Sequence, residues 1–310
     1  MLPQGLLAAL VPTYPASQSS SERSGSLAGE RPAGEPVATA AHDTKAAHSI
    51  FDKFDINGDG LLSFAEFLLV LSLLSIPEED ISTIFSVVDA DGSGTVDAEE
   101  FTVILDHLRN MANLSKSSLK RSGKEQASGL LISFFGPDLK GHLKLPTFID
   151  FLRKLHNDLV ELEFLHYDVG QTGSIPGIDF ARSLVACSDI RAVDALLDKA
   201  ERMPANLAER RVSKDEFSAM HSLCRRKHPL IVALQFTKKL GRRVTKQELS
   251  KIVQQTTGVA LTPTVLDILF EVLGTSEGEL DIDALADLLV RKDMAYSQDQ
   301  KTKESAFRFW

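Results

Sequence analysis

The sequence has 310 residues, of which 43% are hydrophobic and 25% are charged, with a formal net charge of −9. This composition is ordinary for a soluble chain of two or three globular units, and the negative charge disfavours nucleic acid as a partner. No apolar run approaches the ~20 residues of a membrane span, so no transmembrane segment is expected. Two cysteines, Cys187 and Cys224, lack the spacing of a disulfide framework or a zinc site and are expected to be buried or idle thiols.

One pattern recurs along the chain: a polar loop with one branched apolar residue is followed, five residues later, by an aromatic residue or a leucine. The pairs are Leu62/Phe67, Val96/Phe101, Leu143/Phe148, Ile175/Phe180, Val212/Phe217, Val244/Leu249 and Leu280/Leu285. Successive pairs lie 32 to 47 residues apart, which is the length of a helix-loop-helix unit. The sequence therefore predicts an all-α protein built from tandem helix-loop-helix units.

The first unit contains a complete calcium-binding loop of the EF-hand type. Calcium takes 6 to 8 oxygen ligands, which a twelve-residue loop supplies from positions 1, 3, 5, 7, 9 and 12, with glycine at position 6. Residues 55–66 meet each requirement, and Gly60 permits the positive φ of the turn. The predicted ligands are Asp55, Asn57, Asp59, the Leu61 carbonyl, Ser63 directly or through water, and Glu66.

The second unit contains an equally complete loop at residues 89–100. Its predicted ligands are Asp89, Asp91, Ser93, the Thr95 carbonyl, Asp97 and Glu100. Four acidic ligands here against three in the first loop favour tighter or more magnesium-tolerant binding, an order that loop rigidity can reverse. Leu62 and Val96 are expected to pair in a short two-stranded bridge that joins the two loops. The sequence thus predicts two calcium ions as the cofactor.

The five later loops are interpreted as degenerate hands that serve as scaffold. The loop 136–147 has Lys140 at position 5 and Thr147 at position 12, so a cation stands where the ion would bind. In the loop 168–179, Gly170 offers no side-chain oxygen at position 3 and Asp179 is a shorter acid than glutamate at position 12.

The last three loops lose still more ligands. Two of them end at Glu216 and Glu248, and they keep the final carboxylate but little else. The loop around Leu280 begins at Leu273 and ends at Ala284, so both end positions lack a carboxylate. None of these loops is expected to bind calcium.

The predicted fold class is all-α, with tandem EF-hand pairs in two or three lobes and most hands degenerate. Stretches rich in polar and small residues divide the chain into segments. The predicted segments are a remnant of an upstream helical unit at 1–14, a linker at 15–44, a calcium-binding pair at 45–112, a second linker at 113–128, a degenerate pair at 129–188, a C-terminal degenerate lobe at 189–292 and a tail at 293–310.

Particular segments around the loops also resemble a known family. The loops are joined by residues 71–80 (Leu-Ser-Leu-Leu-Ser-Ile-Pro-Glu-Glu-Asp) and followed by residues 134–141 (Phe-Phe-Gly-Pro-Asp-Leu-Lys-Gly), with weaker support from residues 151–164 and 27–31. With these segments the chain resembles the mitochondrial calcium uptake protein family, the EF-hand regulatory subunits of the mitochondrial calcium uniporter. Two consecutive competent hands look more like the plant and protist branch than the animal branch.

The chain departs from the family pattern in three places. The counterpart of the family's C-terminal competent loop, Gly274 to Ala284, is one residue short and lacks ligands. A short tail ending in Trp310 stands where the family has a helix with a subunit-linking cysteine, so a covalent dimer is not expected. Met1 to Gln4 look like the middle of a family segment. The chain is therefore interpreted either as N-terminally truncated or as a product that stays outside mitochondria. Without a visible targeting peptide, it is expected to fail mitochondrial import as written.

The resemblance implies a calcium-sensing regulatory subunit, or gatekeeper, that controls calcium import through the uniporter. It implies a location in the intermembrane space, peripheral to the mitochondrial inner membrane. The implied partners are the uniporter channel subunits and a second EF-hand subunit, identical or related. Catalysis is not expected, because the eight histidines form no HExxH motif and no Walker loop is present. The alternatives are a calcium buffer and a calcium-dependent subunit of a cytosolic enzyme.

Overall fold

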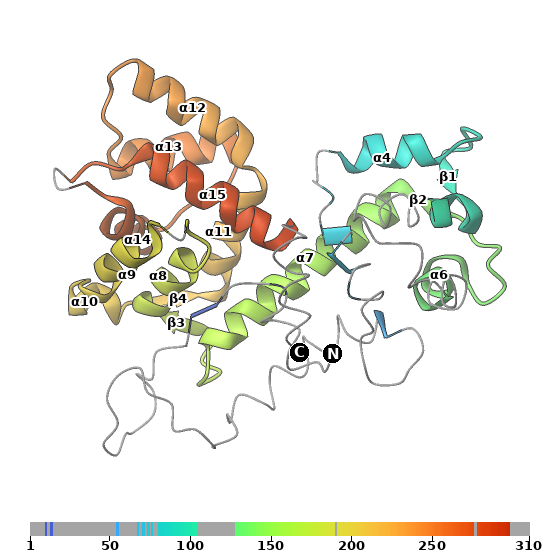
Figure 1. The fold of residues 1–310 in the computed structure, drawn as a ribbon, viewed down its shortest axis with the longest axis horizontal. Helices are drawn as coiled ribbons and strands as arrows, with labels where there is room; N and C mark the ends of the chain where they lie inside the picture. Colours follow the sequence, from blue (N-terminus) through green and yellow to red (C-terminus); the bar gives the residue numbers. More distant parts are fainter. Residues whose placement is uncertain are drawn as a thin grey trace. The chain divides into compact units, whose positions relative to one another are not determined.

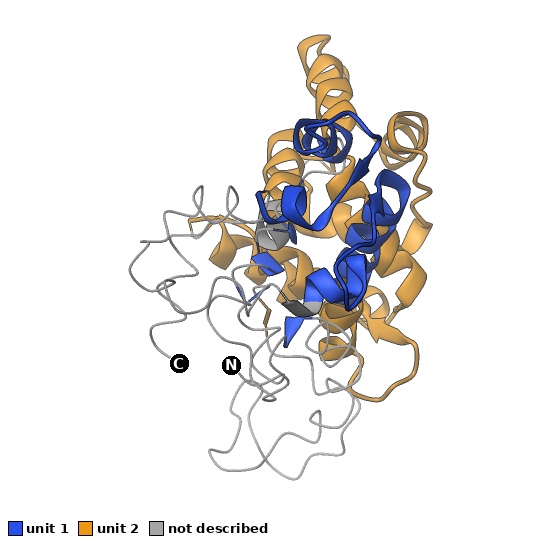
Figure 2. Cartoon of the chain, turned by 90° about the vertical axis from the view of Figure 1, so that its right-hand side faces the viewer, with its two compact units in different colours: residues 1–10, 41–159, 296–310 blue, residues 11–40, 160–295 orange. Residues whose placement is uncertain are grey.

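The computed structural model describes residues 10, 13–14, 54–55, 67, 70–71, 73–74, 76, 80–103, 128–189, 191–275 and 278–297. The contacts divide the chain into two compact units (Figure 2). Unit 1 comprises residues 1–10, 41–159 and 296–310, and unit 2 comprises residues 11–40 and 160–295. The described parts are mainly helical, with strands of only two or three residues, so the predicted all-α class is confirmed.

Unit 1 holds the elements around the second predicted loop (Figure 1). In chain order these are α4 (Ile81–Val88), β1 (Thr95–Val96), α6 (Ser128–Phe135), β2 (Leu143–Lys144) and the first part of α7 (Leu145–Tyr167). Helix α4 forms because Ile81 and Phe85, one turn apart, bury one face of it. It ends at Val88, where the Asp89 N–H donates to the Phe85 carbonyl and the chain turns into the loop.

Unit 2 holds the end of α7 and ten further elements. They are β3 (Ser174–Pro176), α8 (Gly177–Val185), α9 (Val193–Glu201), α10 (Ala205–Ala208), β4 (Arg211–Ser213), α11 (Lys214–Arg225), α12 (Lys227–Lys239), α13 (Lys246–Thr257), α14 (Pro263–Leu273) and α15 (Ile282–Ser297). Helix α15 therefore continues five residues into the segment 293–310 that the sequence assigns to a tail.

Short antiparallel strands join the loops of neighbouring hands. In unit 1, β1 pairs with β2 through Val96 and Leu143, and in unit 2, β3 pairs with β4 through Ile175 and Val212. The last loop carries one isolated bridge, between Gly274 and Leu280. The loop 136–147 is thus paired within unit 1 and the loop 168–179 within unit 2, while the predicted segment bounds stay a prediction.

The structure pairs Val96 with Leu143. The predicted pairing of Val96 with Leu62 lies outside the described residues and stays a prediction. Aromatic packing supports the pairing with Leu143, because the ring of Phe101, which follows β1, lies 5.4, 5.6 and 6.2 Å from the ring centroids of Phe134, Phe135 and Phe148. Edge-to-face contacts at these distances stabilise the packing of the loop 89–100 against the hand formed by α6 and α7.

The recurring pairs of the sequence form the hydrophobic cores of both units. Every described member of the seven pairs is at most 5% exposed, which confirms that the five-residue spacing marks core positions. The described members are Phe67, Val96, Phe101, Leu143, Phe148, Ile175, Phe180, Val212, Phe217, Val244, Leu249, Leu280 and Leu285. The branched residue and the ring or leucine after it therefore anchor each loop to its exiting helix.

A buried charged network ties α15 to the rest of unit 2. The Lys292 ammonium donates to Glu163 Oε1 at 3.0 Å and to the Ser183 carbonyl at 2.9 Å, and His221 Nε2 lies 3.2 Å from Glu163 Oε2. The side chains of Lys292 and Glu163 are fully buried. Burial alone would raise the pKa of Glu163, but Lys292 and His221 outweigh it and hold that pKa below its usual value.

The two thiols are also buried in unit 2, as the sequence predicts. Cys187 and Cys224 form no disulfide. Burial raises the pKa of the Cys224 thiol to about 12, and the nearby Lys292 ammonium opposes this shift without cancelling it. Both cysteines therefore act as small core residues.

The first prediction concerns Lys292. Replacing it with methionine leaves the Glu163 carboxylate buried beside His221 without its ammonium partner, and loss of one member of a buried pair costs about 3–5 kcal/mol. Urea unfolding should therefore show a fall of this size in the free energy of unfolding of unit 2. Arg202→Ala is the control, because Arg202 makes one exposed ion pair, with Asp198. Equal stability of Lys292→Met and Arg202→Ala would contradict the prediction.

The second prediction concerns pH. Burial lowers the pKa of His221 from 6.5 to about 4, so the folded state resists its protonation. Stability from the neutral ring is complete above the unfolded pKa of 6.5 and is lost as the pH falls toward 4. The free energy of unfolding should decline by up to about 1.4 kcal/mol per pH unit over this window. Unfolding curves at a series of pH values should show a shallower decline for His221→Gln, and identical slopes would refute this role.

Candidate calcium site

The loop 89–100 begins with the carboxylate of Asp89, which organises the first half of the loop. Asp89 Oδ1 accepts from the Ser93 N–H and Oδ2 accepts from the Gly94 N–H, both at 2.8 Å. Gly92 and Gly94 adopt φ values of 69° and 78°, in the left-handed region that glycine enters at little cost. The chain thus folds around the Asp89 carboxylate and directs the next oxygens toward it.

Glu100, at the end of the loop, closes it from the other side. Its Oε1 accepts from the Ala90 N–H and its Oε2 accepts from the Asp97 N–H, both at 3.0 Å. The Glu100 N–H in turn donates to Asp97 Oδ1 at 2.9 Å. This reciprocal pair is a capping box at the start of the exiting helix, and it places the Glu100 carboxylate over the loop.

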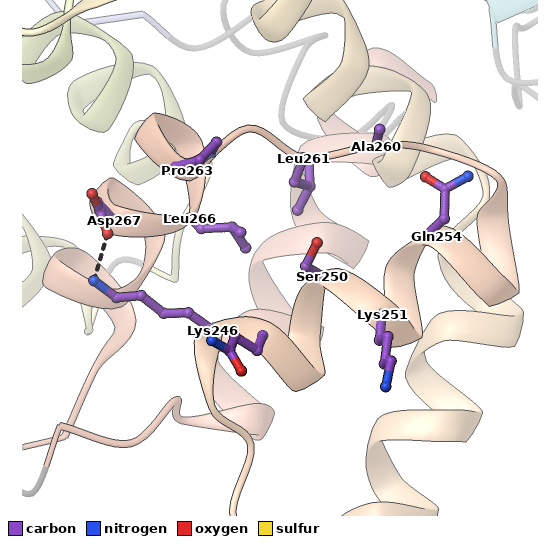
Figure 3. A pocket seen from close by; sticks show the side chains of 10 residues that line it. Lys246, Ser250, Lys251, Gln254, Ala260, Leu261, Pro263, Leu266 and Asp267 are labelled. Carbon is purple, nitrogen blue, oxygen red and sulfur yellow. Dashed lines mark hydrogen bonds and ion pairs between the residues drawn. The ribbon is translucent and has the colours of Figure 1, made fainter.

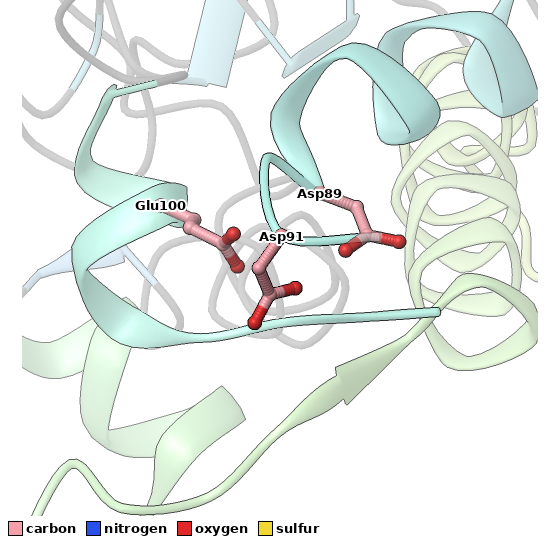
Figure 4. A group of neighbouring side chains, drawn as sticks. All are labelled: Asp89, Asp91 and Glu100. Atoms are coloured by element: carbon pink, nitrogen blue, oxygen red, sulfur yellow. The ribbon is translucent and has the colours of Figure 1, made fainter. Parts of the chain in front are cut away.

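Three carboxylates converge on one point in the loop (Figure 4). One oxygen from each of Asp89, Asp91 and Glu100 lies within 4.8 Å of the others. Two ligands of a single ion can lie no farther apart than twice the ion–oxygen distance, which is about 5 Å for calcium. The three oxygens therefore fit one calcium ion, which would supply the positive charge that three adjacent carboxylates need.

The lowered pKa of Asp91 also favours binding of a cation. Its Oδ1 accepts from the Ser93 N–H at 2.9 Å, and this bond and the Ser93 hydroxyl hold the pKa of Asp91 below its usual value. A carboxylate that remains ionised binds a hard cation without first losing a proton.

The other predicted ligands of this loop lie beside the convergence point but make bonds among themselves. The Ser93 hydroxyl donates to the Thr95 carbonyl at 2.9 Å, so the oxygens of positions 5 and 7 are already adjacent. Asp97 uses Oδ1 to cap the exiting helix. The structure thus brings together Asp89, Asp91 and Glu100, with Ser93 and Thr95 next to them, and the full ligand set stays a prediction.

The first predicted loop lies almost wholly outside the described residues. Of its six predicted ligands, Asp55 is described, and Asn57, Asp59, Leu61, Ser63 and Glu66 are not. The residues that flank the loop, Phe54 and Phe67, are buried, as predicted for Phe67 from its place in the recurring pairs.

The degenerate loops show what the last carboxylate does when the other ligands are missing. Glu216 Oε2 accepts from the Ser213 N–H at 2.7 Å, and Glu248 Oε2 accepts from the Thr245 N–H at 2.9 Å. Each forms a complete capping box for its helix, α11 or α13. The glutamate at position 12 is thus retained as a helix cap, a role that spacing alone did not reveal.

Unit 2 also contains a pocket, which is the kind of site in which an enzyme would bind a substrate (Figure 3). It has a volume of about 530 Å³ between α13 and α14, with Ser250, Leu261 and Leu266 among its lining residues. Lys246 and Asp267, also in its wall, are tied to each other at 2.6 Å. Its ten lining residues include no histidine or cysteine beside Ser250, so they form no nucleophile–base pair of the usual type.

Models of the EF-hand family match both predicted loops. A model described as an EF-hand domain pair matches residues 68–108, and one described as an EF hand matches residues 47–71. An EF-hand match implies calcium binding, in agreement with the carboxylates gathered in the loop 89–100.

Whole-chain similarity identifies the family. The chain is 32% identical over 308 residues to the mitochondrial calcium uptake protein of Arabidopsis thaliana, an overlap that covers 96% of this chain and 60% of the relative. The chain belongs to the mitochondrial calcium uptake protein family. It is 27% identical to human mitochondrial calcium uptake protein 1, over 68% of this chain and 45% of that protein. This member of the family thus spans about half the length of the curated relatives that it matches.

Solved structures show that the family fold extends over most of the chain. The apo structure of the mitochondrial calcium uniporter protein MICU2 matches with a TM-score of 0.62 and 20% identity, over 80% of this chain and 71% of that one. EFHA2 in its calcium-binding state matches with a TM-score of 0.62 and 24% identity, over 72% of this chain and 73% of that one. In the described part of this family member, no helix is both long and apolar enough to span a bilayer.

The third prediction tests the convergence point directly. Glu100→Gln keeps the shape of the side chain but removes the charge that a bidentate ligand supplies, so calcium affinity at this loop should fall by roughly two orders of magnitude. Isothermal titration calorimetry of the purified chain measures this loss. Glu99→Gln is the matched control, because Glu99 is adjacent, exposed and outside the ligand positions. Calcium binding that is equally strong in both variants would exclude Glu100 as a ligand.

Proposed function

We propose that this chain is a calcium-sensing regulatory subunit of the mitochondrial calcium uniporter, and that it acts by binding rather than by catalysis. The observation that carries the proposal is the convergence of Asp89, Asp91 and Glu100 on one point. Membership of the mitochondrial calcium uptake protein family supports the choice of the uniporter as the regulated partner. The proposed location is the intermembrane space, peripheral to the inner membrane.

We further propose that each chain binds two calcium ions. One ion takes oxygens from Asp89, Asp91, Ser93, the Thr95 carbonyl, Asp97 and Glu100. The other takes oxygens from Asp55, Asn57, Asp59, the Leu61 carbonyl, Ser63 and Glu66. The single and paired EF-hand matches, which include both loops, support this number.

The hydrogen bonds of Glu100 suggest how calcium would act on the fold. This carboxylate holds the Ala90 and Asp97 N–H groups, so moving its oxygens onto an ion changes the start of the exiting helix. The same loop is joined through Val96 to Leu143, and α7 begins two residues later, at Leu145. Calcium binding would therefore bias the position of α7 within unit 1 by favouring one of two loop arrangements.

The proposed partners are the uniporter channel subunits and a second EF-hand subunit, identical or related. A sensor must stay bound to its partner while its loops bind or release calcium. Partner binding and ion binding should therefore depend on different residues. A calcium buffer would bind the ions with little change in the helices. Helix movement on binding therefore separates a sensor from a buffer.

The fourth prediction combines the two loops. Glu66→Gln with Glu100→Gln should abolish the calcium response while leaving the fold intact, because the core residues Phe54, Phe85 and Phe101 are untouched. In mitochondria supplied with a targeted version, the double variant should still co-purify with uniporter components, and its co-purification and channel response should no longer depend on calcium.

Glu99→Gln provides a control for this experiment, because it makes the same kind of substitution at one position outside the ligand positions. A double variant whose pull-down and channel response both remain calcium-dependent would remove these loops as the sensor. A variant that binds no uniporter component, together with a wild-type chain that also binds none, would refute the proposed partner.

A further inference from the structure

The loop 168–179 of unit 2 has the internal hydrogen bonds of the calcium loop, position by position. Asp168 Oδ1 accepts from the Thr172 N–H at 2.9 Å and Oδ2 accepts from the Gly173 N–H at 2.8 Å. The Thr172 hydroxyl donates to the Ser174 carbonyl at 2.7 Å. The loop 89–100 makes the same three bonds from Asp89, Ser93 and Gly94. The two loops therefore share one closed shape.

An arginine side chain reaches the ligand positions of the loop 168–179. Arg211 lies on β4, opposite Pro176 of β3. Its Nη2 donates to the Thr172 hydroxyl and to the Ser174 carbonyl, which are the oxygens of positions 5 and 7. Its Nε donates to the Ser174 hydroxyl at 3.0 Å. A guanidinium thus binds two oxygens that a calcium loop offers to its ion.

The far end of the same loop is also engaged by a guanidinium. Asp179, at position 12, is buried, and its Oδ1 lies 3.2 Å from Arg182 Nη1. Arg182 in turn bonds to Glu201 at 2.7 Å. At position 3, Gly170 has no side chain to offer an oxygen. The oxygens at ligand positions 5, 7 and 12, from Thr172, Ser174 and Asp179, are therefore each bonded to an arginine side chain.

The calcium loop differs at the corresponding place. In unit 2, Arg211 is the residue before Val212, which pairs with Ile175. In unit 1, the equivalent position before Leu143, which pairs with Val96, is His142. Among the described residues, no lysine or arginine is bonded to the carboxylates of Asp89, Asp91 or Glu100. The loops 168–179 and 89–100 thus have the same shape, but only in the loop 168–179 do the described residues include a basic side chain bonded to the ligand positions.

We propose that the guanidinium of Arg211 is the built-in cation of the loop 168–179, which holds its closed shape without calcium. The hand formed by α7 and α8 is then fixed in one state, and calcium changes only the loops of unit 1. Arg211 is exposed, so its contribution is local: it keeps the two amides that donate to Asp168 protected from exchange.

Hydrogen exchange followed by mass spectrometry tests the proposal on the full chain. In the wild type, calcium should slow exchange in the peptide that contains Ser93 and Gly94, and it should leave the peptide that contains Thr172 and Gly173 unchanged. With Arg211→Ala, exchange at Thr172 and Gly173 should be about tenfold faster, as expected for the loss of hydrogen bonds from a charged donor. Arg202→Ala, which removes an exposed arginine of the same unit, should change neither peptide.

Two results would overturn the proposal. One is slower exchange at Thr172 and Gly173 of the wild type when calcium is added, which would mean that an ion displaces Arg211. The other is wild-type exchange in a folded Arg211→Ala variant. The calcium comparison needs no substitution, so it can overturn the proposal even where Arg211→Ala unfolds unit 2.

Discussion

The pairing of loops by a short antiparallel bridge is the interaction on which the rest of the fold depends. A single helix-loop-helix hand exposes the branched residue of its loop and the ring five residues later, and a second hand can cover both. Val96 with Leu143, and Ile175 with Val212, supply this cover in units 1 and 2. The loop 136–147, which lacks most calcium-ligand positions, packs through Leu143 against the loop 89–100.

The glutamate at position 12 forms a helix cap both in the candidate calcium loop and in two loops that lack most other ligands. In the calcium loop, Glu100 caps its helix and also points to the place where three carboxylates meet. In the degenerate loops, Glu216 and Glu248 perform only the capping. Because the cap stabilises the helix by itself, the other ligand positions are free to change without unfolding the hand.

Local spacing in the sequence predicted the fold class, the core pairs and the converging carboxylates of the loop 89–100. These features depend on residues within a dozen positions of one another, such as Val96 and Phe101. The pairing of Val96 with Leu143 was not predicted in this way, because it joins separate hands, as do the contacts of Phe101 with three rings of the next hand. The bonds of Lys292 to Glu163 and of Arg211 to Thr172 join residues 129 and 39 positions apart, and no motif marks them.

The burial of the two thiols has a consequence for redox chemistry. With the pKa of Cys224 raised to about 12, only on the order of one thiol in 10⁵ is a thiolate at neutral pH, and the thiolate is the form that oxidants attack. Cys187 and Cys224 are both shielded from solvent within unit 2. While this unit stays folded, changes in the glutathione or peroxide level of its compartment should therefore leave both sulfur atoms reduced.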